Sequence, residues 1–188
     1  MVRSIILLLV LAAALSGCAG TNTQAEAGFV DGAGVRDYAL DEREPAPELV
    51  GETLDGEPVA LSDLEGPVVL NVWASWCGPC AAESPHLQAI NETYADEGVS
   101  VVGVNVRDER TNAKSFERDH GITYPSFYDE DSSLAHELGA VGALPTTLVL
   151  DSEHRIATRI FGGVTAAALS IRLDPLLAEA GGAKERGP

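Results

Sequence analysis

Residues 68–80 have the sequence VVLNVWASWCGPC, and this stretch decides the fold. Its first seven residues are apolar except for Asn71, which is typical of a strand at the centre of a sheet with both faces covered. Cys77 and Cys80 follow almost directly, and the sequence after Cys80 is rich in alanine and glutamate, which favours a helix. The pattern therefore predicts a buried strand that ends at a Cys-x-x-Cys motif, on which a helix begins.

The predicted position of Cys77 at a helix N-terminus has a chemical consequence. Unpaired backbone N–H groups and the positive end of the helix dipole stabilise a thiolate relative to a thiol. We therefore expect Cys77 to be the more acidic and more exposed cysteine, and to attack a substrate disulfide. Cys80 lies one helical turn deeper, where we expect it to resolve the mixed disulfide by reaching back to the first sulfur.

The Cys-x-x-Cys motif has three other interpretations. A structural zinc site needs four ligands, but the chain has only one further cysteine, Cys18, and its histidines lack metal-ligand spacing. A copper metallochaperone also uses two cysteines at this spacing, which is a binding function. A purely structural disulfide that closes so short a loop removes little chain entropy. Gly78 and Pro79 after a buried strand favour redox chemistry, and we expect no metal site.

Composition limits the size and the partners of the folded part. The chain has 188 residues, which suits one domain of ordinary size once an N-terminal segment is removed. Lys and Arg number 12 against 29 Asp and Glu, which gives a formal net charge of -17. Such a surface repels phosphate, so we expect no nucleic-acid partner. The acidity either keeps the protein soluble or complements a cationic partner surface. We expect a monomer.

Residues 1–17 are typical of a secretory signal peptide. Arg3 supplies a positive start, and the apolar run from Ile5 to Leu15 is too short to span a bilayer as a mature helix. The Leu-Ser-Gly-Cys sequence that ends at Cys18 resembles the lipobox of bacterial lipoproteins, in which the cysteine sulfur is lipidated. We therefore expect a lipid anchor on Cys18, which holds an extracytoplasmic domain at the outer face of the cell membrane.

Residues 18–44 are rich in Gly, Ala, Thr, Asn and acidic residues without a sustained period, so we expect a lipid-anchored flexible tether. A folded domain over residues 45–181 and a disordered tail over residues 182–188 complete the predicted organisation. The alternation of strands and helices within the domain predicts an α/β fold, in which helices flank a central mixed β-sheet.

The elements expected in this domain begin with a hairpin, a central strand, a helix that contains Pro85 and a second buried strand parallel to the first. Their ranges are 48–53 with 59–61, 68–74, 80–97 and 99–106. A helix, an edge segment, a further helix, an antiparallel pair of strands and a closing helix follow. Their ranges are 111–120, 124–128, 132–138, 146–150 with 155–161, and 165–180.

Residues 72–80 resemble the active-site segment of thioredoxins. Together with residues 143–147 and the predicted lipid-anchored N-terminus, they are similar to the extracytoplasmic TlpA/ResA-like branch, and the likeness covers residues 45–181. The resemblance implies a thioredoxin fold with an N-terminal β-hairpin extension, and thiol-disulfide exchange as the activity. Peroxiredoxins share the fold and are the rival interpretation. Their peroxidatic cysteine follows a Pro-x-x-x-Thr-x-x-Cys pattern, whereas Leu70 and Ala74 occupy those positions here.

Five residues around the dithiol are expected to meet the substrate. By the resemblance, Pro145 is the cis-proline of the family, and the backbone of Leu144 before it hydrogen-bonds a substrate segment as an added strand would. Trp76 is expected to be partly exposed and to shape the docking surface. Gly78 and Pro79 lie between the cysteines, where Pro79 restrains the loop.

Glu83 is the expected proton acceptor. Thioredoxins keep a buried Asp beneath the dithiol at the position that Asn71 occupies here, so this chain lacks that acceptor. The TlpA/ResA-like branch resembles this chain in having Glu three residues after the second cysteine, at the position of Glu83. A carboxylate there would take the proton from Cys80 as it resolves the mixed disulfide. The alternative is an exposed Glu83 that only favours the helix dipole.

The resemblance also implies a direction and partners for the reaction. Cys-Gly-Pro-Cys resembles the reducing members, so we expect the Cys77-Cys80 pair to reduce disulfides of extracytoplasmic proteins without a bound cofactor. No soluble pool re-reduces it well in an oxidising compartment, so the resemblance implies a membrane thiol reductant of the CcdA/DsbD type. Cytochrome c maturation, with apocytochrome c as substrate, or copper-site maturation would be its use. A copper-binding role without catalysis is the competing class.

Overall fold

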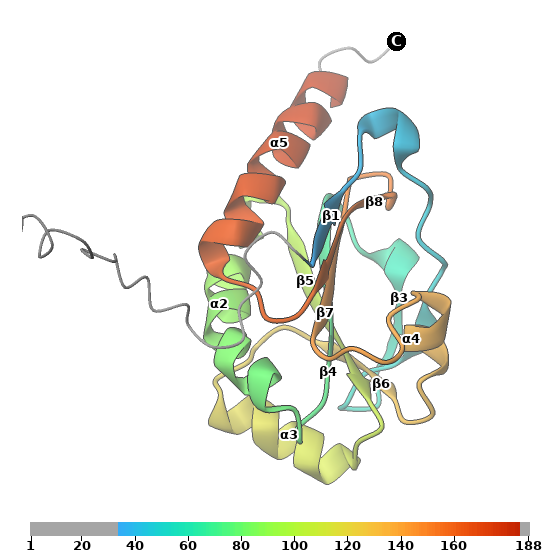
Figure 1. Cartoon of the computed structure of the whole chain (residues 1–188), viewed down its shortest axis with the longest axis vertical. Coiled ribbons are helices and arrows are strands. Elements are labelled where there is room, and N and C mark those ends of the chain that lie inside the picture. The colour runs from blue at the N-terminus through green and yellow to red at the C-terminus, as the bar shows by residue number, and fades with distance from the viewer. Residues whose placement is uncertain (1–33, 185–188) are drawn as a thin grey trace, which may run out of the picture.

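The computed structural model describes residues 34–184, so the predicted signal peptide, Cys18 and most of the predicted tether lie outside the described residues. A mixed six-stranded sheet has the order β1-β8-β7-β4-β5-β6, and β2 and β3 form a separate hairpin (Figure 1). The strands are β1 Val35–Asp37, β2 Val50–Glu52, β3 Pro58–Ala60, β4 Val68–Trp73, β5 Ser100–Val106, β6 Ser126–Asp129, β7 Thr146–Leu150 and β8 Ile156–Phe161. The helices are α2 Gly78–Tyr94, α3 Arg110–Asp119, α4 Ser133–Glu137 and α5 Ala166–Lys184, with short 3-10 turns at Leu40–Glu42, Leu61–Asp63 and Ala95–Glu97.

Strand β4 lies in the middle of the sheet because it is apolar on both faces. All six of its residues are buried, and it pairs in parallel with β5 and antiparallel with β7. Leu70 and Val72 pack in a core with Phe127 and Leu138, whereas Val69 faces the opposite core. The predicted central strand and its parallel neighbour are confirmed, and so is the N-terminal hairpin of β2 and β3.

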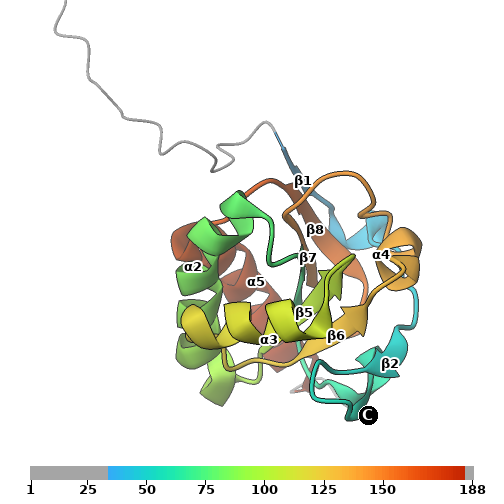
Figure 2. The same ribbon diagram turned by 90° about the horizontal axis from the view of Figure 1, so that it is seen from below.

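Helices cover both faces of the sheet. Leu87 and Ile90 of α2 pack with Leu169 and Leu173 of α5 and with Val69 on one face. The hairpin and α4 lie on the other face, as Figure 2 shows in a view along the sheet. Helix α2 continues through its internal proline, as predicted. The observed layers confirm the predicted α/β fold with a mixed sheet.

The predicted tether over residues 18–44 is wrong from Val35 onward. Val35–Asp37 form β1, which pairs antiparallel with β8, and the N–H of Tyr38 donates to the carbonyl of Ala157 at 2.9 Å. These bonds satisfy the otherwise open edge of β8, which explains why so polar a segment is ordered. The other boundary also differs, because α5 runs to Lys184 and includes the first residues of the predicted tail over 182–188.

A buried carboxylate ties the N-terminal segment to the sheet at the end of β7. Asp151 accepts the N–H groups of Glu153 and Arg155 at 3.0 and 2.9 Å through one oxygen. Its other oxygen accepts Nη1 of Arg43 at 3.2 Å and Nε of Arg155 at 2.9 Å. Arg43 also pairs with Glu179 of α5 at 2.7 Å. The network therefore connects three segments that are far apart in the sequence.

We expect Asp151→Ala to lower the free energy of unfolding by about 3 kcal/mol, because it leaves the buried Arg43 without one partner and orphans two N–H groups. Burial alone would raise the pKa of Asp151, but bonds from Arg155 and Arg43 outweigh it and hold this pKa below its ordinary value. The stabilisation is therefore complete at neutral pH and is lost as pH falls through that lowered pKa. Urea unfolding at neutral and acid pH measures this, with exposed Asp96→Ala as control. Equal unfolding free energies of Asp151→Ala and wild type at pH 7 would contradict it.

Candidate redox site

Cys77 and Cys80 form a disulfide where β4 passes into α2, with their Cα atoms 5.3 Å apart. Cys77 is the N-cap residue of α2, and its Sγ accepts the N–H of Cys80 at 3.2 Å. Pro79 fits the first turn of α2, because a backbone N–H at its position, which proline lacks, would have no acceptor within the helix. The predicted position of the first sulfur at a helix N-terminus is confirmed. Cys77 is 6% exposed and Cys80 2%, so Cys77 is the more accessible of the two, as predicted.

Two tryptophans flank the disulfide in different ways. Trp73 is buried, with its ring stacked 4.8 Å from that of Phe116 and its Nε1 donating to Oγ of Ser126 at 3.3 Å. Trp76 is 58% exposed, in line with the prediction, and its Nε1 donates to the carbonyl of Arg107 at 3.0 Å. Trp73 therefore forms part of the floor of the site, and Trp76 forms part of its surface.

The segment around Pro145 lies beside the disulfide although it is 68 residues (145 − 77) away in the sequence. The Leu144–Pro145 peptide bond is cis, as predicted. Pairing of β7 with β4 places Thr146 opposite Val72, and Leu144 packs against the cluster that contains both cysteines. Phe161 of β8, which is 41% exposed, lies opposite Thr146. The fold therefore groups the predicted substrate-contacting residues at one end of the sheet.

Glu83 is fully buried, so the alternative of an exposed carboxylate on the helix surface is wrong. Its Oε1 accepts Nδ2 of Asn71 at 2.8 Å, and its Oε2 accepts the N–H of Val164 at 2.9 Å. Asn71 also donates to Oγ1 of Thr147 at 3.1 Å. Glu83 lies three residues after Cys80 on α2, a spacing that puts both side chains on one face of the helix.

The environment of Glu83 raises the pKa of its carboxyl above the ordinary value. Burial raises the pKa of Glu83 from 4.5 to about 8, although the hydrogen bonds from Val164 and Asn71 favour the charged form. A carboxyl with this pKa takes up and releases protons near physiological pH, which is the requirement for general base catalysis.

A family model described as AhpC/TSA matches residues 43–159, which is more than half of the chain. The chain belongs to the AhpC/TSA family. It is 34% identical over 121 residues to a thiol-disulfide oxidoreductase ResA from Geobacillus thermodenitrificans, an alignment that covers 64% of this chain and 69% of the relative.

Two solved structures place this AhpC/TSA member more closely. A DsbF homologue from Corynebacterium diphtheriae is 42% identical, with a TM-score of 0.72, and the match covers 78% of this chain and 97% of that one. A secreted thiol-disulfide isomerase from Corynebacterium glutamicum is 38% identical, with a TM-score of 0.73, and the match covers 80% and 99%. The ResA-like resemblance and the thioredoxin fold are confirmed, and the protein is a thiol-disulfide oxidoreductase.

Two contacts of the redox site in this AhpC/TSA member are not indicated by the sequence pattern. Thr147 supports Asn71, and Asp108 binds the backbone and hydroxyl of Ser75, two residues before Cys77. The available signal for Asp108 is its place directly after the end of a buried strand, where loops of α/β folds carry functional side chains.

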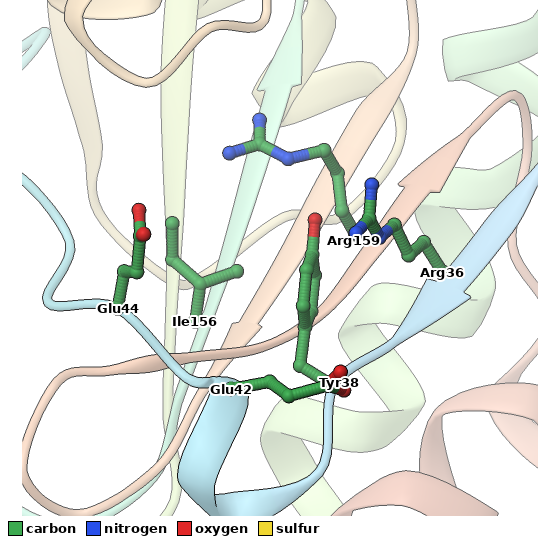
Figure 3. A pocket seen from close by; sticks show the side chains of 6 residues that line it. All are labelled: Arg36, Tyr38, Glu42, Glu44, Ile156 and Arg159. Carbon is green, nitrogen blue, oxygen red and sulfur yellow. The ribbon is translucent and has the colours of Figure 1, made fainter.

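A separate pocket of about 310 Å³ lies at the β1–β8 edge, with its side chains gathered around the ring of Tyr38 (Figure 3). Its lining residues are Arg36, Tyr38, Glu42, Glu44, Ile156 and Arg159. None of the predicted site residues lines it, so it is not part of the redox site. Within residues 34–184, no three His, Cys, Asp or Glu side chains gather as metal ligands would, and no helix has the length and apolarity to cross a membrane.

Proposed function

We propose that the protein reduces disulfides of extracytoplasmic proteins through a Cys77-Cys80 dithiol. The observation that carries this proposal is the sulfur of Cys77 at the N-terminus of α2, with a buried carboxyl, Glu83, one turn beyond Cys80. In the reduced enzyme, the thiolate of Cys77 attacks one sulfur of the substrate disulfide and displaces the other as a thiolate. Cys80 then attacks Sγ of Cys77, the Cys77-Cys80 bond forms, and the second substrate sulfur leaves.

One cycle moves two electrons from the dithiol to the substrate, and Cys80 loses its proton when it attacks. We assign Glu83 as the acceptor of that proton, because its raised pKa suits proton transfer near neutral pH and it lies on the same helix face as Cys80. The departing substrate thiolates take up protons from water. The dithiol is the only redox group that this exchange needs.

The substrate is proposed to lie across the exposed ring of Trp76 and the Leu144–Pro145 segment. The backbone of Leu144 would hydrogen-bond an extended substrate segment, which is the geometry of strand addition. Gly78 and Pro79 are exposed between the cysteines, and apart from its chain neighbours and the backbone of α2, a Cβ at Gly78 would meet no atom within 4 Å. Open space of this kind beside the disulfide supports the approach of a protein substrate to Cys77.

A membrane anchor at Cys18 is part of the proposal, and the entry point of the chain into the fold supports it. Gly34 accepts the N–H of Phe161 at 2.9 Å, and Gly162 donates to the carbonyl of Pro145 at 2.9 Å. The N-terminal segment therefore joins the fold at the same end as the redox site, whereas α5 ends at the opposite end (Figure 1). The fifteen residues 19–33 span at most about 50 Å, which would keep the dithiol within reach of a membrane reductant of the CcdA/DsbD type.

Cys18→Ser is expected to move the protein from the membrane fraction to the soluble extracytoplasmic fraction, because the lipid anchor can no longer be attached. Cell fractionation followed by immunoblotting measures this distribution. Recovery of Cys18→Ser in the membrane fraction at the wild-type level would refute lipidation at this position, and it would leave the redox chemistry of the domain untouched.

The direction of the reaction is tested with the purified, reduced protein. We expect it to reduce insulin and a model apocytochrome peptide whose two cysteines form a disulfide, and to be strongly reducing in equilibrium with glutathione. An equilibrium like that of strong oxidants would overturn the assignment as a reductant. Stoichiometric Cu(I) binding without disulfide reduction would favour the metallochaperone instead, and rapid consumption of hydrogen peroxide would favour a peroxide reductase.

A further inference from the structure

The loop after β5 contacts the residues that precede the disulfide. Trp76 donates its Nε1–H to the carbonyl of Arg107 at 3.0 Å, and the guanidinium of Arg107 lies 5.5 Å from the Trp76 ring centroid. Arg107 has a φ of 48°, a left-handed conformation that residues other than glycine rarely adopt. Such conformations cost free energy and persist where the surrounding contacts enforce them. The contact with Trp76 is therefore one of the contacts that hold the loop after β5 in this conformation.

Asp108, the next residue in this loop, binds Ser75, the residue before Trp76. Its Oδ2 accepts the N–H of Ser75 at 2.6 Å and Nδ2 of Asn105 at 3.1 Å, and its Oδ1 accepts the hydroxyl of Ser75 at 2.8 Å. The side chain is 8% exposed, and these three donors are neutral. The phenol of Tyr128 donates to the carbonyl of Asp108 at 3.1 Å, which also holds its backbone. The two oxygens of Asp108 therefore fix Ser75 through both its backbone N–H and its hydroxyl.

These contacts matter most when the disulfide is reduced. In the disulfide form, the covalent bond to Cys80 holds Cys77 at the start of α2. Reduction removes this constraint, and the helix N-terminus stabilises the thiolate only while Cys77 keeps its N-cap position. The bonds between Asp108 and Ser75 involve neither sulfur, so they remain available after reduction.

We propose that Asp108 is a positioning residue that keeps Cys77 at the N-terminus of α2 when the dithiol is reduced. The inference rests on the proposed role of Cys77 as the attacking thiolate. Loss of the contacts would destabilise the reduced form and leave the disulfide form nearly unchanged. The variant would therefore be a slower nucleophile, and its disulfide would be harder to reduce.

Two substitutions separate the position of Asp108 from its charge. Asp108→Asn retains the shape, because the amide oxygen accepts the N–H of Ser75 and the amide nitrogen donates to its hydroxyl. Asp108→Ala removes every side-chain contact. Asp151→Ala is the matched control, since Asp151 is also a buried carboxylate that accepts backbone N–H groups. Asp151 follows the C-terminal end of β7, whereas Thr146, beside the redox site, begins that strand.

The full chain, purified in detergent and reduced, is tested by the rate of Cys77 alkylation with iodoacetamide at pH 7 and by its thiol-disulfide equilibrium with glutathione. We expect Asp108→Ala to lower the alkylation rate constant and to raise the equilibrium constant for disulfide formation. Each change should be about tenfold, which corresponds to a rise of about one unit in the pKa of the Cys77 thiol. Asp108→Asn and Asp151→Ala should remain close to wild type in both measurements.

Wild-type alkylation in Asp108→Ala would overturn the positioning role. Asp108→Asn as slow as Asp108→Ala would also overturn it, because the charge and not the position would then matter. If Asp108→Ala does not fold, Ser75→Ala removes the hydroxyl contact alone and should slow alkylation about threefold. An unchanged rate there would reject the proposal. A wild type that alkylates as expected but exchanges no disulfide would refute the proposed function and not the role of Asp108.

Discussion

Replacing Cys77 with serine is expected to abolish disulfide reduction, with a loss of at least about 10³-fold in rate. A serine hydroxyl stays protonated near neutral pH, and its oxygen cannot form the mixed disulfide, so the first step has no nucleophile. Insulin reduction by the purified variant and by the wild type measures the loss. Retention of more than a small fraction of the wild-type rate would show that Cys77 is not the attacking sulfur.

Cys80→Ser is the matched control for this result, because it keeps Cys77 and removes only the resolving thiol. We expect Cys80→Ser to form mixed disulfides that persist, since no second sulfur displaces the substrate. Non-reducing gels followed by mass spectrometry would then identify the trapped partners, apocytochrome c included if the proposed use is right. Accumulation of the same adducts in Cys77→Ser, and not in Cys80→Ser, would reverse the two assigned roles.

Glu83→Gln is expected to slow resolution of the mixed disulfide by about 10²-fold at pH 7, the lower end of the range for general base catalysis. The wild-type rate should rise with pH through about 8, the raised pKa of the buried carboxyl, and the variant should lose this rise. Acid-quenched single turnovers between pH 6 and 9 measure the mixed disulfide directly. Glu92→Gln, an exposed carboxylate on the same helix, is the control. A wild-type pH profile in Glu83→Gln would rule out Glu83 as the proton acceptor.

The raised pKa of Glu83 also makes the free energy of unfolding depend on pH. The folded disulfide form keeps a proton on Glu83 up to about pH 8, whereas the unfolded chain releases it near 4.5. The folded state therefore binds more protons across this window, and stability falls as pH rises through it, by at most about 1.4 kcal/mol per pH unit. Glu83→Gln removes this contribution, so its unfolding free energy should vary less with pH between those values.

The fold could be predicted where several signals coincide in one stretch. Residues 68–80 combine an apolar run, a Cys-x-x-Cys motif and a helix start, and the structure has all three at those positions. Strand β1 was missed because Val35–Asp37 are three residues of mixed polarity, too few to show a period of two. Its order comes from pairing with β8, a partner about 120 residues later in the chain.

The reacting groups of the candidate site could be predicted from the sequence, but the residues that hold them in position could not. Cys77 and Glu83 follow from the motif, its placement on a helix and a family resemblance. Asp108 could not be singled out, because a lone Asp after a strand is common in turns, and its partner Ser75 lies 33 positions earlier. The parallel pairing of β4 with β5 was predicted, but the register of this pairing and the course of the loop after β5, which bring Asp108 to Ser75, were not.

The central claim is that the start of α2 holds the sulfur of Cys77 ionised in the reduced protein. The pH dependence of Cys77 alkylation in the reduced wild type tests this claim most directly. We predict a midpoint well below about 8.5, the value of a free cysteine, and alkylation of Cys77 before Cys80. A midpoint at or above that of a free cysteine, or faster alkylation of Cys80, would contradict the account.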